Sequence, residues 1–145
     1  PEVLGSIEFG CVGAGAKLIV VVGHNRCVAV QSAIDFMQDK QDPVLNKCEY
    51  VRSIVQSLES VVRDSESSQP VNNKGNESIF EADIAVRQNV QRSVNEILQK
   101  SASIFDLVHS GQVGIIGMVY DVTTGGCHVM DETSHGLGET SSINM

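Results

Sequence analysis

The sequence predicts an α/β fold with a mainly parallel central sheet, flanked by helices and closed by an edge hairpin at the C-terminal end. Two apolar runs of strand length, KLIVVV at residues 17–22 and VGIIGMVYDV at 113–122, carry the β-branched residues of buried strands. Segments with helical spacing of apolar residues separate them, which favours a parallel sheet. A TTGG turn and a short run, CHVM at 127–130, predict the hairpin.

Helices are predicted on both sides of the first strand. The earlier one covers residues 3–15 and ends in the glycine-rich GAGA, and the later one covers residues 25–39. We expect both faces of KLIVVV to be covered, because no polar residue interrupts it after Lys17. Gly23 follows this strand and is expected to let the chain turn sharply.

Three more helices are predicted before the second strand, over residues 46–63, 79–100 and 101–111. The last has Ser101 or Ser103 as its N-cap and Gly111 as its stop. The polar stretch at residues 63–78, rich in Ser and Asn, is expected to form a surface loop.

Length and charge limit the domain organisation and the partners. The 145 residues fit one domain, expected over residues 1–130, and the polar residues 131–145 are expected to form a disordered tail. A formal net charge of -8 argues against nucleic acid or an anionic membrane as a partner. We expect no membrane insertion by this segment, because no apolar stretch approaches the roughly 20 residues that a bilayer requires.

The cysteines favour a reducing compartment. There are four of them, they are scattered along the chain, and the opening PEVLGSIEFG lacks the basic start and apolar core of a secretory signal. We therefore expect free thiols and a cytoplasmic location. Cys11 and Cys48 are expected to be small buried hydrophobes, while Cys127 and His128 are adjacent and would point to opposite faces of a strand.

His24 and Cys27 are the candidate metal ligands. They stand three residues apart after the carboxyl end of the first strand, the edge at which open α/β sheets place their ligands. The start of the next helix would favour the thiolate form of Cys27, and a thiolate with an imidazole suits zinc. A second thiolate and a water would complete a tetrahedral catalytic site. On spacing alone, the alternative is a packed cysteine beside a capping histidine.

The stretch GSIEFGCVGAGAKLIVVVGHNRCVAVQSAI, residues 5–34, resembles the core of the β-class carbonic anhydrases. That family has a helix reading Ser-(Leu/Ile)-Glu-(Tyr/Phe), an apolar strand and then Gly-His-x-x-Cys-Gly, and the three motifs stand here in the same order. VGIIGMVYDVTTGG, residues 113–126, resembles the family's closing strand, Gly-x-x-Tyr-Asp-(hydrophobic)-x-Thr-Gly. Within that family, the sequence of residues 4–27 most resembles the carbonic-anhydrase-like domains associated with bacterial anion transporters.

The resemblance implies reversible hydration of carbon dioxide to bicarbonate by a zinc-bound hydroxide, in a homodimer or tetramer. His24 and Cys27 match two of the family's three zinc ligands, and Gly23 and Val28 are possible lining of the pocket. The family's first zinc-binding Cys lies in a Cys-x-Asp-x-Arg motif, whose Asp and Arg orient the metal-bound water. That motif does not occur in these 145 residues. We therefore expect an N-terminally incomplete domain with an incomplete zinc site and no catalytic residue within this chain.

Three interpretations of the function stay open at this point. The chain is a piece of a carbonic anhydrase whose first zinc ligand lies upstream, or it is a catalytically inactive carbonic-anhydrase-like binding or regulatory module. The third is an α/β domain with an incidental His-x-x-Cys. Val28 departs from the family's Gly after the zinc-binding Cys, and strand 113–122 is expected at a sheet edge, where it could pair with another subunit.

Overall fold

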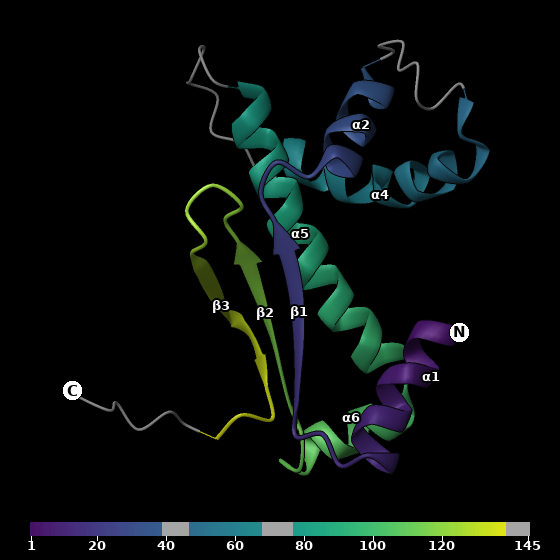
Figure 1. Ribbon diagram of the computed structural model, residues 1–145, viewed down its shortest axis with the longest axis vertical. Coiled ribbons are helices and arrows are strands. Elements are labelled where there is room, and N and C mark those ends of the chain that lie inside the picture. Colours follow the sequence, from purple (N-terminus) through teal and green to yellow (C-terminus); the bar gives the residue numbers. More distant parts are fainter. Residues whose placement is uncertain (39–46, 68–76, 139–145) are drawn as a thin grey trace, which may run out of the picture. The chain divides into compact units, whose positions relative to one another are not determined.

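The structure is a computed structural model that describes residues 1–38, 47–67 and 77–138 (Figure 1). The chain divides into two compact units. Unit 1 comprises Pro1–Val22, Val90–Val119 and Cys127–Met145, and unit 2 comprises Gly23–Asn89 and Tyr120–Gly126.

The α/β class predicted from the alternation of strands and helices is confirmed. The helical elements are α1 (Glu2–Glu8), the π-helix η1 (Phe9–Gly13), α2 (Val28–Met37), α4 (Glu49–Ser67), α5 (Glu77–Lys100) and α6 (Ala102–His109). The strands are β1 (Leu18–His24), β2 (Gly114–Tyr120) and β3 (Cys127–His135).

The strands form one sheet in the order β1-β2-β3. β1 and β2 run parallel, because Gly114 N donates to Lys17 O at their start (2.9 Å) and Asn25 N donates to Tyr120 O at their end (3.1 Å). β3 returns as the expected edge hairpin. β2 is therefore the central strand, and the expectation that it lies at a sheet edge is wrong.

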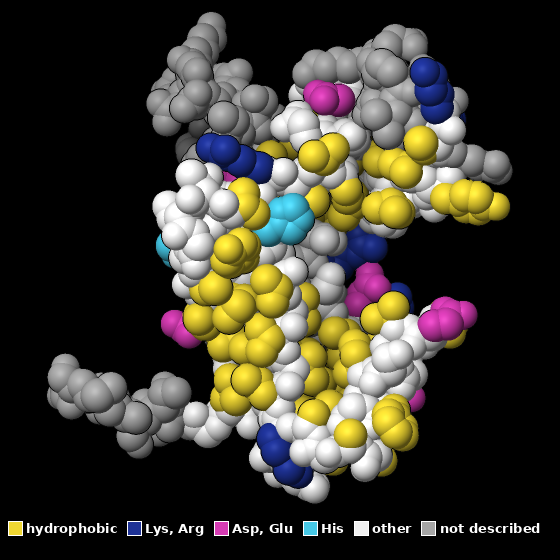
Figure 2. Space-filling view, viewed as in Figure 1, with side chains coloured by type: hydrophobic (Ala, Val, Ile, Leu, Met, Phe, Trp, Pro, Cys, Tyr) yellow, Lys and Arg dark blue, Asp and Glu magenta, His cyan; other side chains and the backbone are white. Residues whose placement is uncertain are grey.

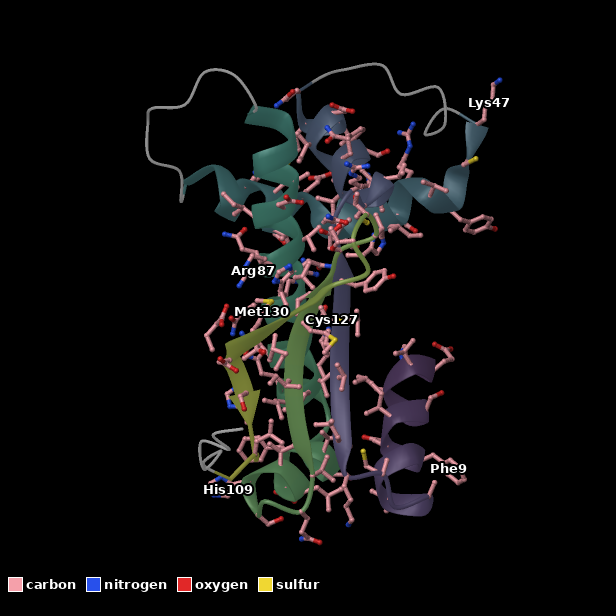
Figure 3. The ribbon with its side chains drawn as sticks, turned by 60° about the vertical axis from the view of Figure 1, so that its left-hand side comes forward. Phe9, Lys47, Arg87, His109, Cys127 and Met130 are labelled. Carbon is pink, nitrogen blue, oxygen red and sulfur yellow. The ribbon has the colours of Figure 1, made fainter. Side chains whose placement is uncertain are left out.

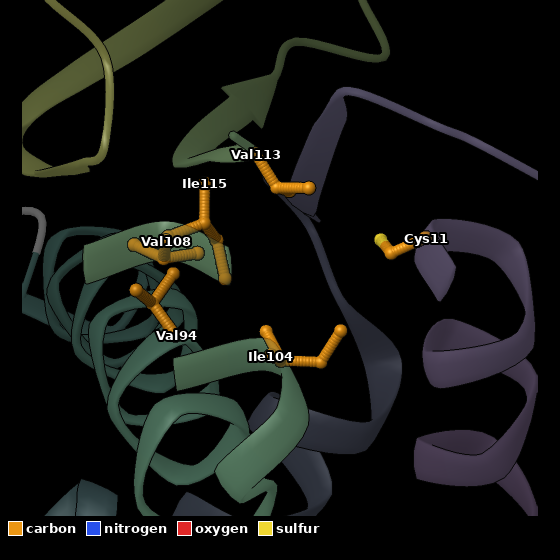
Figure 4. Close-up of a cluster of buried hydrophobic side chains, with 6 residues drawn as sticks. All are labelled: Cys11, Val94, Ile104, Val108, Val113 and Ile115. Atoms are coloured by element: carbon orange, nitrogen blue, oxygen red, sulfur yellow. The ribbon is translucent and has the colours of Figure 1, made fainter. Parts of the chain in front are cut away.

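Unit 1 has a compact aliphatic core to which η1, α5, α6 and β2 contribute (Figure 4). Its buried members are Cys11, Val94, Ile104, Val108, Val113 and Ile115. The N-cap of α6 is Ser101, whose Oγ accepts a hydrogen bond from Ile104 N (3.2 Å) and donates one to Glu8 Oε1 (2.6 Å). This buried hydroxyl ties the start of α6 to α1.

One face of β1 is open. Leu18, Val20 and Val22 are 40–55% exposed, whereas the alternate residues Ile19 and Val21 pack against the core of unit 1. Figure 2 shows hydrophobic side chains gathered over the strands on this side. The expectation that both faces of this run are covered is therefore wrong within the described residues, because the alternation of a strand divides its side chains between two faces.

The first helix shows the same division of its apolar side chains. Cys11 is buried, whereas Phe9 is 72% exposed and projects away from the strands (Figure 3). Glu8 also faces inward, towards Ser101. The helix is held to unit 1 by one side only.

Helix or strand extends into two segments for which a loop or a disordered tail was expected. α4 runs to Ser67 and α5 begins at Glu77, so helix occupies both ends of the loop expected at 63–78, whose residues 68–76 lie outside the described residues. β3 likewise runs to His135, into the tail expected at 131–145, whose residues 139–145 are not described.

A buried hydroxyl explains why β3 continues. Thr133 is 0% exposed, and its Oγ1 accepts from Gly117 N (2.6 Å) and donates to Met130 O (2.6 Å). A Cβ on Gly117 would come 2.5 Å from Val90 Cγ1 on α5 and 2.9 Å from Thr133 Oγ1 on β3, so glycine is required where β2 packs between these two elements. The composition of the tail does not reveal this hydrogen bond between Thr133 and Gly117.

Unit 2 is built on the packing of α2 against α4. Each helix buries one aliphatic stripe, with Val30, Ala33 and Ile34 on α2 and Val55, Leu58 and Val62 on α4. Among the described residues, no helix combines the length and the apolar character needed to cross a bilayer.

We predict that Ile104→Ala lowers the free energy of unfolding by about 2–5 kcal/mol, because it empties a fully buried site in the core of unit 1. Val3→Ala is the control, since Val3 is 74% exposed and its truncation should change the free energy by no more than about 0.5 kcal/mol. Chemical denaturation measures both values. Equal losses for the two variants would contradict the assigned core.

Candidate metal centre

The turn between β1 and α2 holds both candidate ligands. β1 ends at His24, and Cys27 is the N-cap of α2, with φ -69° and ψ 113°. Between them Arg26 has φ 53°, the left-handed region that side chains other than glycine rarely adopt. Gly23 lies inside β1, so the expectation that it makes the turn is wrong.

His24 carries its ring at the surface of unit 2, and its Nδ1 lies 3.0 Å from Asn25 O. A carbonyl oxygen only accepts hydrogen bonds, so Nδ1 carries the proton and donates. With Nδ1 as the donor, the neutral form of the ring has its lone pair on Nε2. That lone pair is the one a metal ion requires, and an engaged Nδ1 is typical of metal-binding histidines.

Cys27 is a free, half-buried cysteine that opens on a cavity of about 360 Å³ within unit 2. Arg26, Asp35 and Asp83 also line this cavity. Val28, the first residue of α2, lines it too, although this side chain is 76% exposed. The residues that line the cavity beside Cys27 thus include charged residues of both signs.

The donors fit zinc in type but not in number. An imidazole with a free Nε2 and a cysteine thiol are the donors that zinc prefers. Among the described residues, no three His, Cys, Asp or Glu side chains come together in an arrangement that could hold a metal ion. The turn between β1 and α2 therefore offers two protein ligands, one fewer than a catalytic zinc uses.

The other three cysteines differ in their burial. Cys11 is buried in the core of unit 1, as expected, and Cys127 is exposed on β3. Cys48 is exposed, so the expectation that it is a buried hydrophobe is wrong. Cys48 directly precedes α4, whereas Cys11 lies within η1 and packs into the core of unit 1.

Asn25 and Asp121 join the turn before α2 to the turn after β2. Asn25 Nδ2 donates to Asp121 Oδ1 (2.9 Å), and Asn25 Oδ1 accepts from Val122 N (3.0 Å). Asp121 also accepts from Thr123 N at Oδ1 (2.8 Å) and from the Thr124 hydroxyl at Oδ2 (2.9 Å). Its carboxylate therefore organises the turn of the hairpin and also binds the residue beside His24.

These donors hold the pKa of Asp121 well below its usual range. The backbone N–H of Thr123 has the largest effect, followed by the side chains of Asn25 and Thr124. Because the pKa of the folded state is depressed, the ionised carboxylate stabilises this turn at neutral pH. That contribution declines as the pH falls below about 4, the ordinary value for Asp.

The sequence contained a signal for this connection. Asp121 opens DVTTGG, a pattern of Asp followed by Thr and Gly that is typical of turns closed by an Asp side chain. Its pairing with Asn25 joins residues 96 positions apart. Without the parallel register of β1 and β2, nothing in the sequence relates the two.

The comparisons with known proteins point to one family. The family described as carbonic anhydrase matches residues 1–127. Carbonic anhydrase 2 of Mycobacterium tuberculosis (strain CDC 1551 / Oshkosh) is 26% identical over 137 residues, which is 94% of this chain and 59% of that protein. The carbonic anhydrase of Mycolicibacterium smegmatis is 25% identical over 123 residues, covering 85% of this chain and 53% of that protein. The chain thus spans little more than half the length of these relatives.

Solved structures share the fold. The β-carbonic anhydrase CcaA matches with a TM-score of 0.67 at 20% identity, covering 88% of this chain and 57% of that one. One of two tetrameric β-carbonic anhydrases of Sordaria macrospora matches with a TM-score of 0.66 at 14% identity, covering 89% and 59%. Together with the family match over most of the sequence, this likeness establishes that the chain belongs to the carbonic anhydrase family.

Proposed function

We propose that this chain is part of a carbonic anhydrase, which converts carbon dioxide and water reversibly to bicarbonate, and that His24 and Cys27 are two of its zinc ligands. The observation that carries the proposal is the turn between β1 and α2, in a chain of this family. There an imidazole with its Nε2 lone pair free stands three residues from a thiol that opens on a cavity.

Each residue of this turn has a role in the proposal. His24 Nε2 and Cys27 Sγ would hold the metal, and the thiol would give up its proton on binding. A zinc ion bound there lowers the pKa of a water molecule towards neutrality and so supplies a nucleophile. Arg26 would attract the bicarbonate product, whereas the carboxylates of Asp35 and Asp83 would repel it and limit its retention.

The third protein ligand has to come from elsewhere. The resemblance assigns it to the Cys of a Cys-x-Asp-x-Arg motif, and residues 1–145 contain no such motif. We therefore place this ligand, and the Asp and Arg that accompany it, outside the given residues.

The proposal extends to location and assembly. The four free cysteines favour a reducing compartment such as the cytoplasm. A homodimer or a tetramer is the proposed assembly, supported by the tetrameric Sordaria macrospora proteins that share the fold.

We predict that the complete encoded protein binds about one zinc ion per chain. His24→Ala and Cys27→Ser should each weaken zinc binding by more than about 100-fold, because loss of a direct ligand costs more than loss of its outer partners. Elemental analysis gives the stoichiometry, and competition with a chromophoric chelator gives the affinity.

Cys48→Ser and His128→Ala are the matched controls, since both side chains are exposed and lie outside the turn between β1 and α2. Each should bind zinc as the unmodified protein does. A complete protein without zinc, or a Cys27→Ser variant with full affinity, would overturn the assignment.

We predict that carbon dioxide hydration by the complete protein disappears on chelation and returns when zinc is added, because the metal supplies the nucleophile. Residues 1–145 alone should show negligible activity, since they hold two of the three ligands. Stopped-flow measurement of proton release follows both. Activity that survives chelation, or a chelator-sensitive activity of residues 1–145 alone, would contradict this proposal.

A further inference from the structure

We propose that Asn25 is a positioning residue that fixes the ring of His24 through its own backbone carbonyl, with Asp121 as its anchor. The side-chain hydrogen bonds of Asn25 to Asp121 and to Val122 N are called the Asn25 clamp below. The inference rests on the proposed function, because it gives the clamp a role in metal binding.

Asn25 is held to the turn after β2 at three points. Its backbone N–H donates to Tyr120 O (3.1 Å). Its side chain donates to Asp121 Oδ1 (2.9 Å) and accepts from Val122 N (3.0 Å). Both halves of the carboxamide are thus engaged by one short segment, which sets the orientation of the amide.

The anchor is itself a closed turn. Asp121 N donates to Gly126 O (2.8 Å), and Gly125 N donates to Asp121 O (2.8 Å). Gly125 has φ 78°, a conformation that glycine adopts without strain. Thr123 N donates to the Asp121 carboxylate from inside the same turn (2.8 Å). Asn25 is therefore attached to a segment whose own backbone is fixed.

The fixed residue holds the ring. With its N–H and side chain fastened, Asn25 has little freedom to rotate its carbonyl, and that oxygen accepts from His24 Nδ1 (3.0 Å). The His24 side chain is exposed, so water competes for Nδ1 and a stationary acceptor is what preserves the hydrogen bond. The consequence is an Nε2 lone pair with a set tautomer and a set direction, which favours metal binding.

We expect the Asn25 clamp to affect the orientation of the His24 ring more than the stability of the fold. Val122 is 49% exposed, so water can replace the carboxamide oxygen at its N–H when Asn25 is truncated. The backbone hydrogen bond from Asn25 N to Tyr120 O would also remain. Truncation should therefore loosen the His24 ring while the fold persists.

The test compares zinc affinity and ring tautomer in the complete encoded protein. Zinc affinity is measured by chelator competition, and the His24 tautomer is read from ¹⁵N NMR of the metal-free protein at a pH where the ring is neutral. For Asn25→Ala we expect about a tenfold weaker zinc affinity, as for loss of an outer partner of a ligand. We also expect a mixture of tautomers in place of the Nδ1–H form.

Ser53→Ala is the matched control. It removes one exposed side-chain hydrogen bond, from Ser53 Oγ to Tyr50 O (2.8 Å), within the same unit. Zinc affinity and the His24 tautomer should both stay unchanged in this variant. A change as large as that of Asn25→Ala would show that any lost hydrogen bond in unit 2 has this effect, and it would overturn the proposal.

A charge exchange separates geometry from electrostatics. Asn25→Asp alone sets two carboxylates against each other where the 2.9 Å hydrogen bond now lies, and should weaken zinc binding by about tenfold or more. The added negative charge by itself would strengthen binding of a cation. In the double variant Asn25→Asp/Asp121→Asn, the pair again carries one carboxylate and one amide. The amide nitrogen introduced at position 121 would replace the oxygen that accepts from Thr123 N, so only part of the lost affinity should return.

The outcomes separate this inference from the proposed function. If the protein binds zinc but Asn25→Ala changes neither the affinity nor the tautomer, the clamp is wrong and the zinc site stands. If the protein binds no zinc but Asn25→Ala still gives a mixture of His24 tautomers, the Asn25 clamp does fix the His24 ring and the proposed function fails. Tighter zinc binding by Asn25→Asp than by the unmodified protein would also overturn the clamp.

Discussion

The parallel pairing of β1 with β2 is the interaction on which the candidate site depends. It brings the carboxyl ends of both strands to one edge, where Asn25 N donates to Tyr120 O (3.1 Å). Parallel strands place their following turns side by side, which is why ligand sites of open α/β sheets lie there. Residues 24–27 and 120–126 meet only because of this register. A slip of one residue would turn every side chain of β1 to the opposite face.

Much of this architecture follows from periodicity. The apolar runs predict β1 and β2, and helical spacing predicts α2, α4, α5 and α6. Hydroxyl chemistry predicts a serine N-cap for α6 at Ser101 or Ser103, and the cap is Ser101. The composition of residues 131–145 wrongly indicates disorder up to His135, because the order of β3 depends on a hydrogen bond between Thr133 and Gly117. Contacts between residues far apart in the sequence escape a local pattern.

The sequence likewise predicts some features of the candidate site and not others. His24 and Cys27 are recognisable because ligand-type residues follow a strand of strongly apolar character. The turn at Arg26 is not recognisable, since a left-handed conformation at a residue other than glycine is imposed by its surroundings. Nor is the role of Asn25, which depends on Asp121 at the end of another strand. A glycine at position 23 suggests a turn, but the strand continues through it.

The central claim is that His24 and Cys27 bind the same zinc ion. Zinc K-edge X-ray absorption of the zinc-loaded complete protein tests it most directly, with Cys27→Ser measured beside it at saturating zinc. The expected first shell contains imidazole nitrogen at about 2.0–2.1 Å and sulfur at about 2.3 Å, and the sulfur contribution should fall in the variant. A first shell of oxygen alone, or a sulfur contribution that Cys27→Ser leaves unchanged, would contradict the claim.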